Sequence, residues 1–226
     1  MYTGIVQEQL TVSSVAKKEG LTTFTVDFPD HLMEGLETGA SVAVNGVCFT
    51  VTSIESTFDG NTDSNTDNNI ISFDAIRETL DLSNIKYLEP GTMVNIERSA
   101  KQDAEVGGHI LSGHVVDTAT VSEILASENN CRITFRGNQS WLKYVFEKGF
   151  LAVNGASLTV AALNRSDESF SINLIPETLK RTNFSLLTEG DEVNIEIESQ
   201  TQVIVDTVRE FLSDQATREL LLSAVD

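Results

Sequence analysis

One sequence pattern occurs twice in this chain, once in each half. Residues 41–51 read SVAVNGVCFTV and residues 150–160 read FLAVNGASLTV, 109 positions later. Further along, the segments ETL at 78–80 and VNIE at 94–97 recur 99 positions later. Matched blocks at a nearly fixed period indicate a duplicated structural unit, and the drop in offset indicates about ten extra residues in the first copy. In a chain of 226 residues, the duplication predicts two domains of about 100 residues each.

Strand-like segments dominate both copies. Short runs rich in Val, Ile, Thr and Phe, such as FSINLI at 170–175, alternate with turn residues. Asn45-Gly46 and Asn154-Gly155 each separate two such runs. Asn-Gly is the strongest short hairpin signal, because a type I′ turn needs positive φ at both central residues. The sequence therefore predicts an all-β fold with a barrel or sandwich in each half, plus short helices at 77–84 and 176–183.

Two segments lie outside the duplicated pattern. Residues 56–69, STFDGNTDSNTDNN, hold almost nothing that could be buried, so a surface loop is predicted there. After Glu198, residues Val205, Val208 and Leu212 recur at helical spacing. The predicted amphipathic helix could pack on its own subunit or bundle with helices of other copies, and the periodicity favours neither.

The net charge of −19 at pH 7 constrains the partners of this chain. Nucleic-acid phosphates and anionic lipid surfaces would be repelled, so neither nucleic acid nor membrane is an expected partner. The carboxylates keep the surface solvated, and the charge would also suit a salty cytoplasm, where ions screen the repulsion. Because there is neither a secretory signal nor a long apolar stretch, a cytoplasmic location is predicted. Cys48 and Cys131 lack metal-site spacing, and no disulfide between them is expected.

Differences between the two copies indicate which residues could carry chemistry. Residues two apart on a strand share a face, so Cys48 lies beside Thr50 in one copy and Ser157 beside Thr159 in the other. A thiol therefore stands in the first copy where the second copy has a hydroxyl.

Histidine distinguishes a second pair of segments. SGHV at 112–115 aligns with TGIV at 3–6, so that His114 stands where the first copy has isoleucine. Because imidazole can donate or accept a proton near neutral pH, His114 is a catalytic candidate. His109 has no counterpart in the first copy and is a weaker candidate, and His31 is expected in an exposed turn.

Over nearly its whole length the chain resembles the riboflavin synthases of the two-domain, lumazine-dismutating type. The matching segments are long, keep their order and occur in both halves. They are YTGIVQ, ETGASVAVNGVCFTV, FDAIRETL, VNIERSAK, EVGGHILSGHV, KGFLAVNGASLTV, NLIPETLKRT and VNIEIESQTQVIVDTV.

The resemblance implies a fold and a reaction. Residues 1–99 and 100–199 would each form a six-stranded Greek-key barrel that binds one 6,7-dimethyl-8-ribityllumazine, and residues 200–226 would form an oligomerisation helix. The enzyme would be a homotrimer, with each active site between the N-terminal barrel of one subunit and the C-terminal barrel of a neighbour. A four-carbon unit would pass from one lumazine to the other, giving riboflavin and 5-amino-6-ribitylaminouracil without cofactor or metal. Two similar pockets suit a reaction between two molecules of one compound.

The resemblance also implies the site residues. Cys48 and Ser41 would lie at the N-terminal pocket, and His114, Ser157 and Thr159 at the C-terminal pocket. His114 is predicted to move a proton of the acidic 7-methyl group, while Cys48 and Ser157 activate or hydrogen-bond the ring system. The catalytic set is thus Cys48, His114, Ser157 and Ser41. Substrate contacts are expected from Gly4, Ile5, Val6, Phe49, Thr50, Asp74, Ala75, Ile76, Arg77, Glu78, Thr79, His109, Gly113, Val115, Lys148, Asn154, Leu158, Thr159, Ile175, Pro176, Glu177, Thr178, Leu179 and Glu198.

Three positions depart from the family pattern. Asn154 and Glu198 each stand where aspartate is usual, and Val47 replaces a cysteine often found beside Cys48. Asn154 keeps the tolerance of positive φ but removes a charge, Glu198 places its carboxylate one methylene further out, and Val47 is interpreted as packing.

The alternative to an enzyme is a non-catalytic antenna protein of the same fold that binds lumazine or flavin. Such proteins keep the barrels but lose catalytic side chains. Cys48, His114, Ser157 and Thr159 are all present here, which favours a catalyst.

Overall fold

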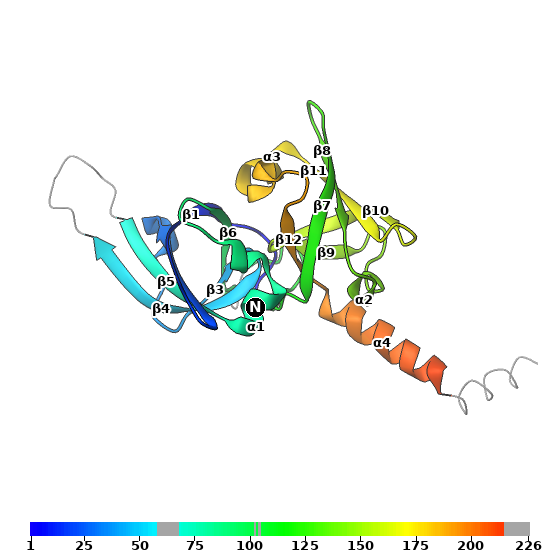
Figure 1. Cartoon of the computed structure of the whole chain (residues 1–226), viewed down its shortest axis with the longest axis horizontal. Helices are drawn as coiled ribbons and strands as arrows, with labels where there is room; N and C mark the ends of the chain where they lie inside the picture. The colour runs from blue at the N-terminus through cyan, green and yellow to red at the C-terminus, as the bar shows by residue number, and fades with distance from the viewer. Residues whose placement is uncertain (58–67, 102, 104, 215–226) are drawn as a thin grey trace, which may run out of the picture.

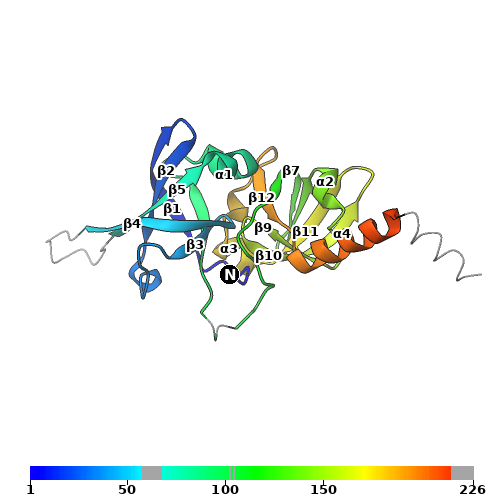
Figure 2. The same cartoon turned by 90° about the horizontal axis from the view of Figure 1, so that it is seen from below.

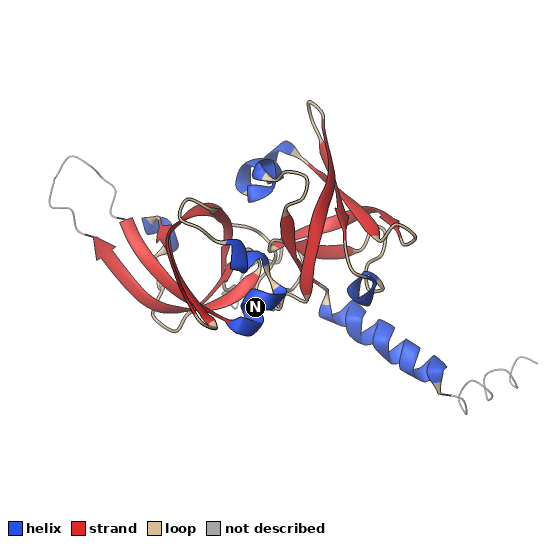
Figure 3. Ribbon diagram, viewed as in Figure 1, coloured by secondary structure: helices blue, strands red, loops and turns tan. Residues whose placement is uncertain are grey.

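The computed structural model describes residues 1–57, 68–101, 103 and 105–214. Its strands form two closed antiparallel barrels that lie side by side, and a helix projects from the second barrel (Figure 1). Colouring by secondary structure shows how far strands outweigh helices (Figure 3). The predicted all-β fold with two tandem six-stranded barrels and a C-terminal helix is confirmed.

Both barrels have the same topology. The strand order is β1-β2-β5-β4-β3-β6 in the first and, read from β7, β7-β8-β11-β10-β9-β12 in the second. β2 therefore pairs with β5 and β1 with β6, as in a Greek key. The strands are β1 (Glu8–Lys18), β2 (Leu21–Phe28), β3 (Ser41–Val44), β4 (Val47–Thr57), β5 (Asn68–Ile76), β6 (Met93–Arg98), β7 (Asp117–Ala126), β8 (Cys131–Arg136), β9 (Phe150–Val153), β10 (Ala156–Asn164), β11 (Ser169–Leu174) and β12 (Glu192–Glu196).

The predicted Asn-Gly hairpins are confirmed. Asn45 and Gly46 have φ of 47° and 79°, and Asn154 and Gly155 have φ of 44° and 79°, the positive values that a type I′ turn requires. They join β3 to β4 and β9 to β10.

Irregularities in the strands are duplicated as well. The register of β4 against β5 shifts between Val51 and Ser53, and that of β10 against β11 shifts between Val160 and Ala162, 109 positions later. A bulge bends the strand and increases its twist, which helps a small sheet to close into a barrel.

Apolar side chains fill both barrel interiors. In the first barrel Phe24 meets Phe49 edge to face, with ring centroids 5.1 Å apart, and Phe73 lies 5.4 Å from Phe24. In the second, Phe135 stacks on Phe170 at 5.2 Å. Because side chains alternate along a strand, a filled interior forces the polar side chains of β4 and β10 onto the outer walls.

The predicted loop at 56–69 is wrong at its ends. Ser56 and Thr57 continue β4 and pair with Asn69 and Asn68 of β5. Asn69 is buried, and its side-chain amide is satisfied by hydrogen bonds that it donates to Asp30 Oδ1 and Phe28 O. The extra residues of the first copy thus lengthen this hairpin. The rest of the predicted loop lies outside the described residues.

The short segments before the first strand of each barrel cross to the other barrel. They meet as an antiparallel pair, in which the Tyr2 amide donates to Leu111 O at 2.8 Å and the Leu111 amide donates to Tyr2 O at 2.9 Å. Val6 then packs in the core of the second barrel, whereas Val115 packs against the core of the first. The predicted domain limits at 99 and 199 therefore stay a prediction, since each barrel uses a segment from beyond its own strands.

Six asparagines lie at the contact between the barrels, three from equivalent positions of each copy. Asn95 Nδ2 donates to Asn154 O at 2.9 Å, and the equivalent Asn194 Nδ2 donates to Asn45 O at 2.8 Å. The backbone amides of Asn84 and Asn183 complete the pattern by donating to the side chains of Asn194 and Asn95. We call this set the asparagine seam; its members are Asn45, Asn84, Asn95, Asn154, Asn183 and Asn194.

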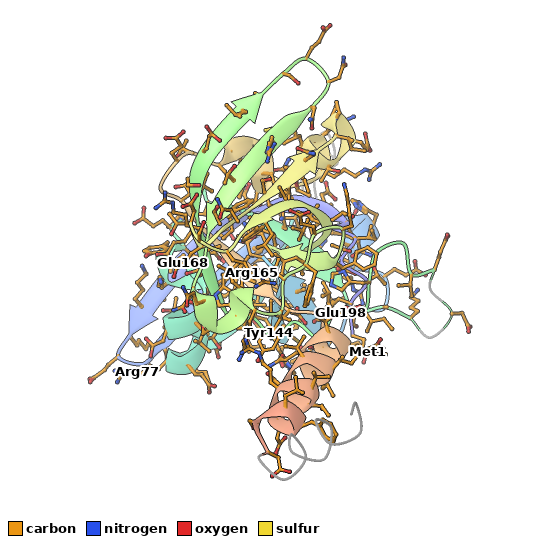
Figure 4. The ribbon with its side chains drawn as sticks, turned by 90° about the vertical axis from the view of Figure 1, so that its right-hand side faces the viewer. Met1, Arg77, Tyr144, Arg165, Glu168 and Glu198 are labelled. Carbon is orange, nitrogen blue, oxygen red and sulfur yellow. The ribbon has the colours of Figure 1, made fainter. Side chains whose placement is uncertain are left out.

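The predicted short helices are confirmed as α1 (Arg77–Leu82) and α3 (Pro176–Arg181), and α2 (Gln139–Leu142) precedes β9. Helix α4 (Ser199–Ser213) points away from the second barrel (Figure 2). Tyr144 lies beside the start of α4 (Figure 4), and its hydroxyl donates to Asp206, at the middle of the helix, at 2.7 Å. Among the described residues, no helix has the length and apolar character needed to cross a membrane.

Candidate functional site

The outer wall of the first barrel carries a cluster around Cys48. The Cys48 side chain points outward on β4, next to Thr50, as predicted. Gly113 of the crossing segment lies directly over it, and its carbonyl accepts the Cys48 amide at 3.0 Å. A Cβ on Gly113, which has φ of 79°, would lie 2.5 Å from Cys48 Cβ, so only glycine fits here. A cavity of about 260 Å³ beside it is lined by Val47, Cys48, Glu78, Thr79, Leu82, Ser83, Gly113, His114 and Val115.

The outer wall of the second barrel carries the equivalent cluster around Ser157. Gly4, with φ of 73°, lies over Ser157 and accepts its amide at 2.8 Å. His109 adds a partner that the first copy lacks, because its Nδ1 lies 2.6 Å from Ser157 Oγ. The imidazole also stacks on Phe150, with centroids 5.2 Å apart.

His109 is buried, and its surroundings favour the neutral ring. Burial lowers the pKa of the imidazole, and the nearby carboxylates of Glu198 and Glu196 oppose that shift. Its Nε2 is buried without a hydrogen-bond partner among the described residues. A neutral imidazole beside a serine hydroxyl can accept or donate a proton at that hydroxyl.

The predicted grouping of the histidines is wrong. His114 lines the cavity of Cys48 on the first barrel, rather than that of Ser157 on the second. The reason is the crossing of the segments, which places the residues after Gly113 against the first barrel and those after Gly4 against the second. His109, which seemed the weaker candidate, lies beside Ser157.

Two buried glutamates hold the crossing segments in place. Glu97 accepts the Thr3 amide at 2.6 Å, the Thr3 hydroxyl at 2.8 Å and the Gly4 amide at 3.0 Å. Glu196 accepts the equivalent three groups of Ser112 and Gly113. Burial raises the pKa of Glu97, against the effect of these hydrogen bonds. Both glutamates thus fix the glycines over Cys48 and Ser157, and the sequence prediction did not include them.

Further predicted residues surround the two clusters on the outside of the barrels. α1 carries Glu78 and Thr79 into the cavity beside Cys48. The equivalent helix α3 begins at Pro176 and carries a Glu177–Arg181 pair of 2.5 Å. The predicted residues that are at least partly exposed are Ile5, Ser41, Thr50, Asp74, Ile76, Arg77, Glu78, Thr79, Val115, Lys148, Leu158, Thr159, Ile175, Pro176, Glu177, Thr178, Leu179 and Glu198.

Lys148, Asp74 and Glu198 also make hydrogen bonds within the protein. Lys148 has φ of 63°, and its amide donates to Val160 O at 2.9 Å. Asp74 accepts the Thr23 hydroxyl at 2.6 Å. Glu198 precedes α4 and accepts the hydroxyl of Thr201. Its position near His109 explains its effect on that imidazole.

Four predicted contacts have side chains turned into the protein. Phe49 and Ala75 point into the first barrel and Val6 into the second, so only their backbone could meet a ligand. Asn154 belongs to the asparagine seam and is 1% exposed. Its Oδ1 accepts the side-chain amide of Asn84, from the first barrel, at 3.1 Å, so the side chain links the two barrels and does not reach either cluster.

The sequence prediction missed two further side chains at the clusters, Tyr2 and Phe150. Tyr2 Oη donates to Cys48 Sγ at 3.1 Å, and Phe150 lies on His109. Within the described residues, no group of three or more His, Cys, Asp or Glu side chains is placed to hold a metal ion.

Comparisons with known proteins agree with this duplicated architecture. The lumazine binding domain model matches twice, over residues 3–99 and 112–198. The chain is 46% identical to the riboflavin synthase of Escherichia coli strain K12 over 94% of both chains. It is 38% identical to that of Chlamydia pneumoniae, over 94% of this chain and 98% of the relative. The chain therefore carries two tandem lumazine binding domains, and its relatives place it in the transferase class. The chain belongs to the riboflavin synthase family.

Solved structures of similar fold include two complexes of LumP. The complex with riboflavin has a TM-score of 0.77 at 24% identity, covering 88% of this chain and 100% of LumP. The complex with 6,7-dimethyl-8-(1'-D-ribityl) lumazine has a TM-score of 0.74 at the same identity. These similarities concern the fold alone.

Proposed function

We propose that this enzyme dismutates two molecules of 6,7-dimethyl-8-ribityllumazine. A four-carbon unit leaves one molecule and joins the other, so that riboflavin and 5-amino-6-ribitylaminouracil form. The observation that carries this proposal is the pair of equivalent outer-wall clusters, each with a glycine of a crossing segment over a reactive side chain. Two like pockets suit two like substrates.

One lumazine gives up the four-carbon unit and the other receives it, so the two binding clusters need different side chains around the same compound. Cys48 lies near His114 and Glu78, whereas Ser157 lies beside His109 and Phe150. In this proposal His114, in the Cys48 cavity, moves the proton of the acidic 7-methyl group, and Ser157 hydrogen-bonds the second ring system. Ser41, whose strand position is opposite Thr50, completes the outer wall next to Cys48.

Placement of two substrates in register supplies much of the rate enhancement. Converting an encounter of two molecules into a reaction between fixed neighbours can contribute about 7–11 kcal/mol. Both clusters lie on outer walls, so a further surface has to cover them. We propose that a neighbouring protomer of a homotrimer does so, with the N-terminal barrel of one subunit facing the C-terminal barrel of the next, and that the enzyme works in the cytoplasm.

The apolar face of α4 supports a trimer. Val203, Ile204, Val208, Phe211 and Leu212 are each about half exposed or more, which is unusual for five large apolar side chains on one helix. Bundling with the same helix of other protomers would bury them.

The first experiment measures turnover of the purified enzyme with dimethylribityllumazine. One riboflavin should appear for every two lumazines consumed. His114→Ala should reduce turnover strongly, and the matched control His31→Ala should not, since that histidine pairs with Glu8 on the surface. Tight binding of lumazine with stable fluorescence and no riboflavin would instead indicate a non-catalytic antenna protein.

A second experiment tests whether each site is shared between subunits. Cys48→Ala and Ser157→Ala inactivate different barrels of the chain. If sites form between protomers, refolding the two inactive variants together creates some intact sites and restores activity. If both clusters of one chain form a single site, every site in the mixture stays defective, and no recovery occurs.

A further inference from the structure

Tyr2 is buried in the crossing segment, yet its hydroxyl reaches the first-barrel cluster. The residue is 2% exposed, and Oη donates to Cys48 Sγ at 3.1 Å. Cys48 itself is exposed, so the sulfur has the buried phenol on one side and the cavity with His114 on the other. A buried hydroxyl needs a partner, and here the partner is the sulfur.

The hydrogen bond between Tyr2 and Cys48 has no equivalent in the second cluster. Leu111 is equivalent to Tyr2 and pairs with it across the centre of the molecule, but its side chain is apolar and 3% exposed. Ser157 instead has His109, which comes from the linker and has no equivalent in the first copy. Each reactive side chain therefore has its own buried partner, a phenol for the thiol and an imidazole for the hydroxyl.

The electrostatic surroundings keep the phenol protonated. Burial raises the pKa of Tyr2, and the hydrogen bond to Cys48 and the charges of Glu97 and Glu196 act in the same direction. On the open side, Glu78 and His114 are the titratable groups that line the cavity with Cys48. Tyr2 can therefore act as a hydrogen-bond donor throughout the neutral pH range.

We propose that Tyr2 is a positioning residue that holds Cys48 Sγ toward the cavity. A hydrogen bond donated to sulfur is stronger when the sulfur is charged. The thiolate is also the better hydrogen-bond acceptor and nucleophile toward an electron-poor ring. The catalytic consequence rests on the proposed function, in which Cys48 contacts substrate, but the effect on the thiol itself does not.

The test compares the rate of Cys48 alkylation by iodoacetamide in the wild-type enzyme and in Tyr2→Phe. Sulfur displaces iodide in this reaction, and the thiolate is the reacting form. We expect the variant to react roughly threefold to tenfold more slowly near neutral pH, the ratio that corresponds to losing one hydrogen bond. Mass spectrometry of the labelled peptides separates Cys48 from Cys131.

Two controls exclude a structural effect. Tyr144→Phe removes a hydroxyl that donates to Asp206 of α4, and it should leave the rate of Cys48 alkylation unchanged. Cys131 is buried in the core, so its protection from label reports that each variant is folded.

The outcomes separate this proposal from the proposed function. An unchanged rate of Cys48 alkylation in Tyr2→Phe would overturn the positioning role, even if turnover fell. Slower alkylation with full turnover would support the positioning role and show that the contact between Tyr2 and Cys48 is not needed for the reaction.

Discussion

The contact between the two Asn-Gly turns makes a sharp prediction about stability. Gly46 and Gly155 face each other, and a Cβ added to Gly46 would lie 2.6 Å from the backbone nitrogen of Gly155. Both have φ of 79°, so a side chain there is strained for a second reason. Gly46→Ala is therefore destabilised by the close contact and by the positive φ, and a second glycine in the structure allows the two effects to be measured separately.

Each cost has a known scale. Placing a residue with a Cβ in the left-handed region costs about 1–2 kcal/mol, and forcing extra atoms into a packed contact costs about 1–3 kcal/mol. Gly46→Ala should thus lose about 2–5 kcal/mol of unfolding free energy. For a chain of this size that corresponds to roughly 4–20 °C in melting temperature.

Gly20→Ala is the matched control. Gly20 has φ of 73°, but no atom lies within 4 Å of its added Cβ. It should show the cost of strain alone, about 1–2 kcal/mol. Urea unfolding of the wild type and both variants gives the difference. Equal losses for Gly46→Ala and Gly20→Ala would refute the claim that the two turns are packed against each other.

Three further predictions concern pH, salt and assembly. Because the pKa of His109 is lowered in the native protein, the unfolded chain binds more protons than the native one as the pH falls through about 6.5. The free energy of unfolding should therefore decrease on acidification through that pH. Between about pH 7.5 and 5.5, the urea midpoint of His109→Gln should fall less than that of the wild type. Because the net charge is −19, the melting temperature should rise as NaCl shortens the Debye length from about 30 Å to 3 Å, and a flat response would argue against adaptation to salt. Phe211→Asp should reduce the mass found by light scattering below that of the proposed trimer, whereas Arg209→Ala should not. A trimer mass in both variants would show that α4 does not hold the proposed assembly.

Local signals predicted the repeated parts of the fold. The Asn-Gly pairs required positive φ, and the alternation of side chains on β4 placed Cys48 and Thr50 on one face. The same alternation turns Phe49 inward, so the sequence already indicates that only its backbone could meet a ligand.

Exchange of segments between the barrels could not be predicted from local patterns. Alignment of the copies correctly paired His114 with Ile5, but it could not show that both segments cross to the opposite barrel. Asn154 was assigned to the ligand for a related reason. Its turn signal is local, whereas its partners Asn194 and Asn84 come from distant strands and loops.

The reciprocal crossing of the segments around Tyr2 and Leu111 limits how the chain can be divided. If the chain were cut between the repeats, Cys48 would lose its contact with Gly113, and Ser157 would lose its contact with Gly4. In each fragment the outer wall that carries the reactive side chain would then be uncovered. In an isolated N-terminal fragment, Cys48 could be covered again only by the equivalent Gly4 segment of a second copy of the fragment. Such a fragment should therefore pair with itself, and the pair would carry two identical sites where the intact chain has two distinct ones.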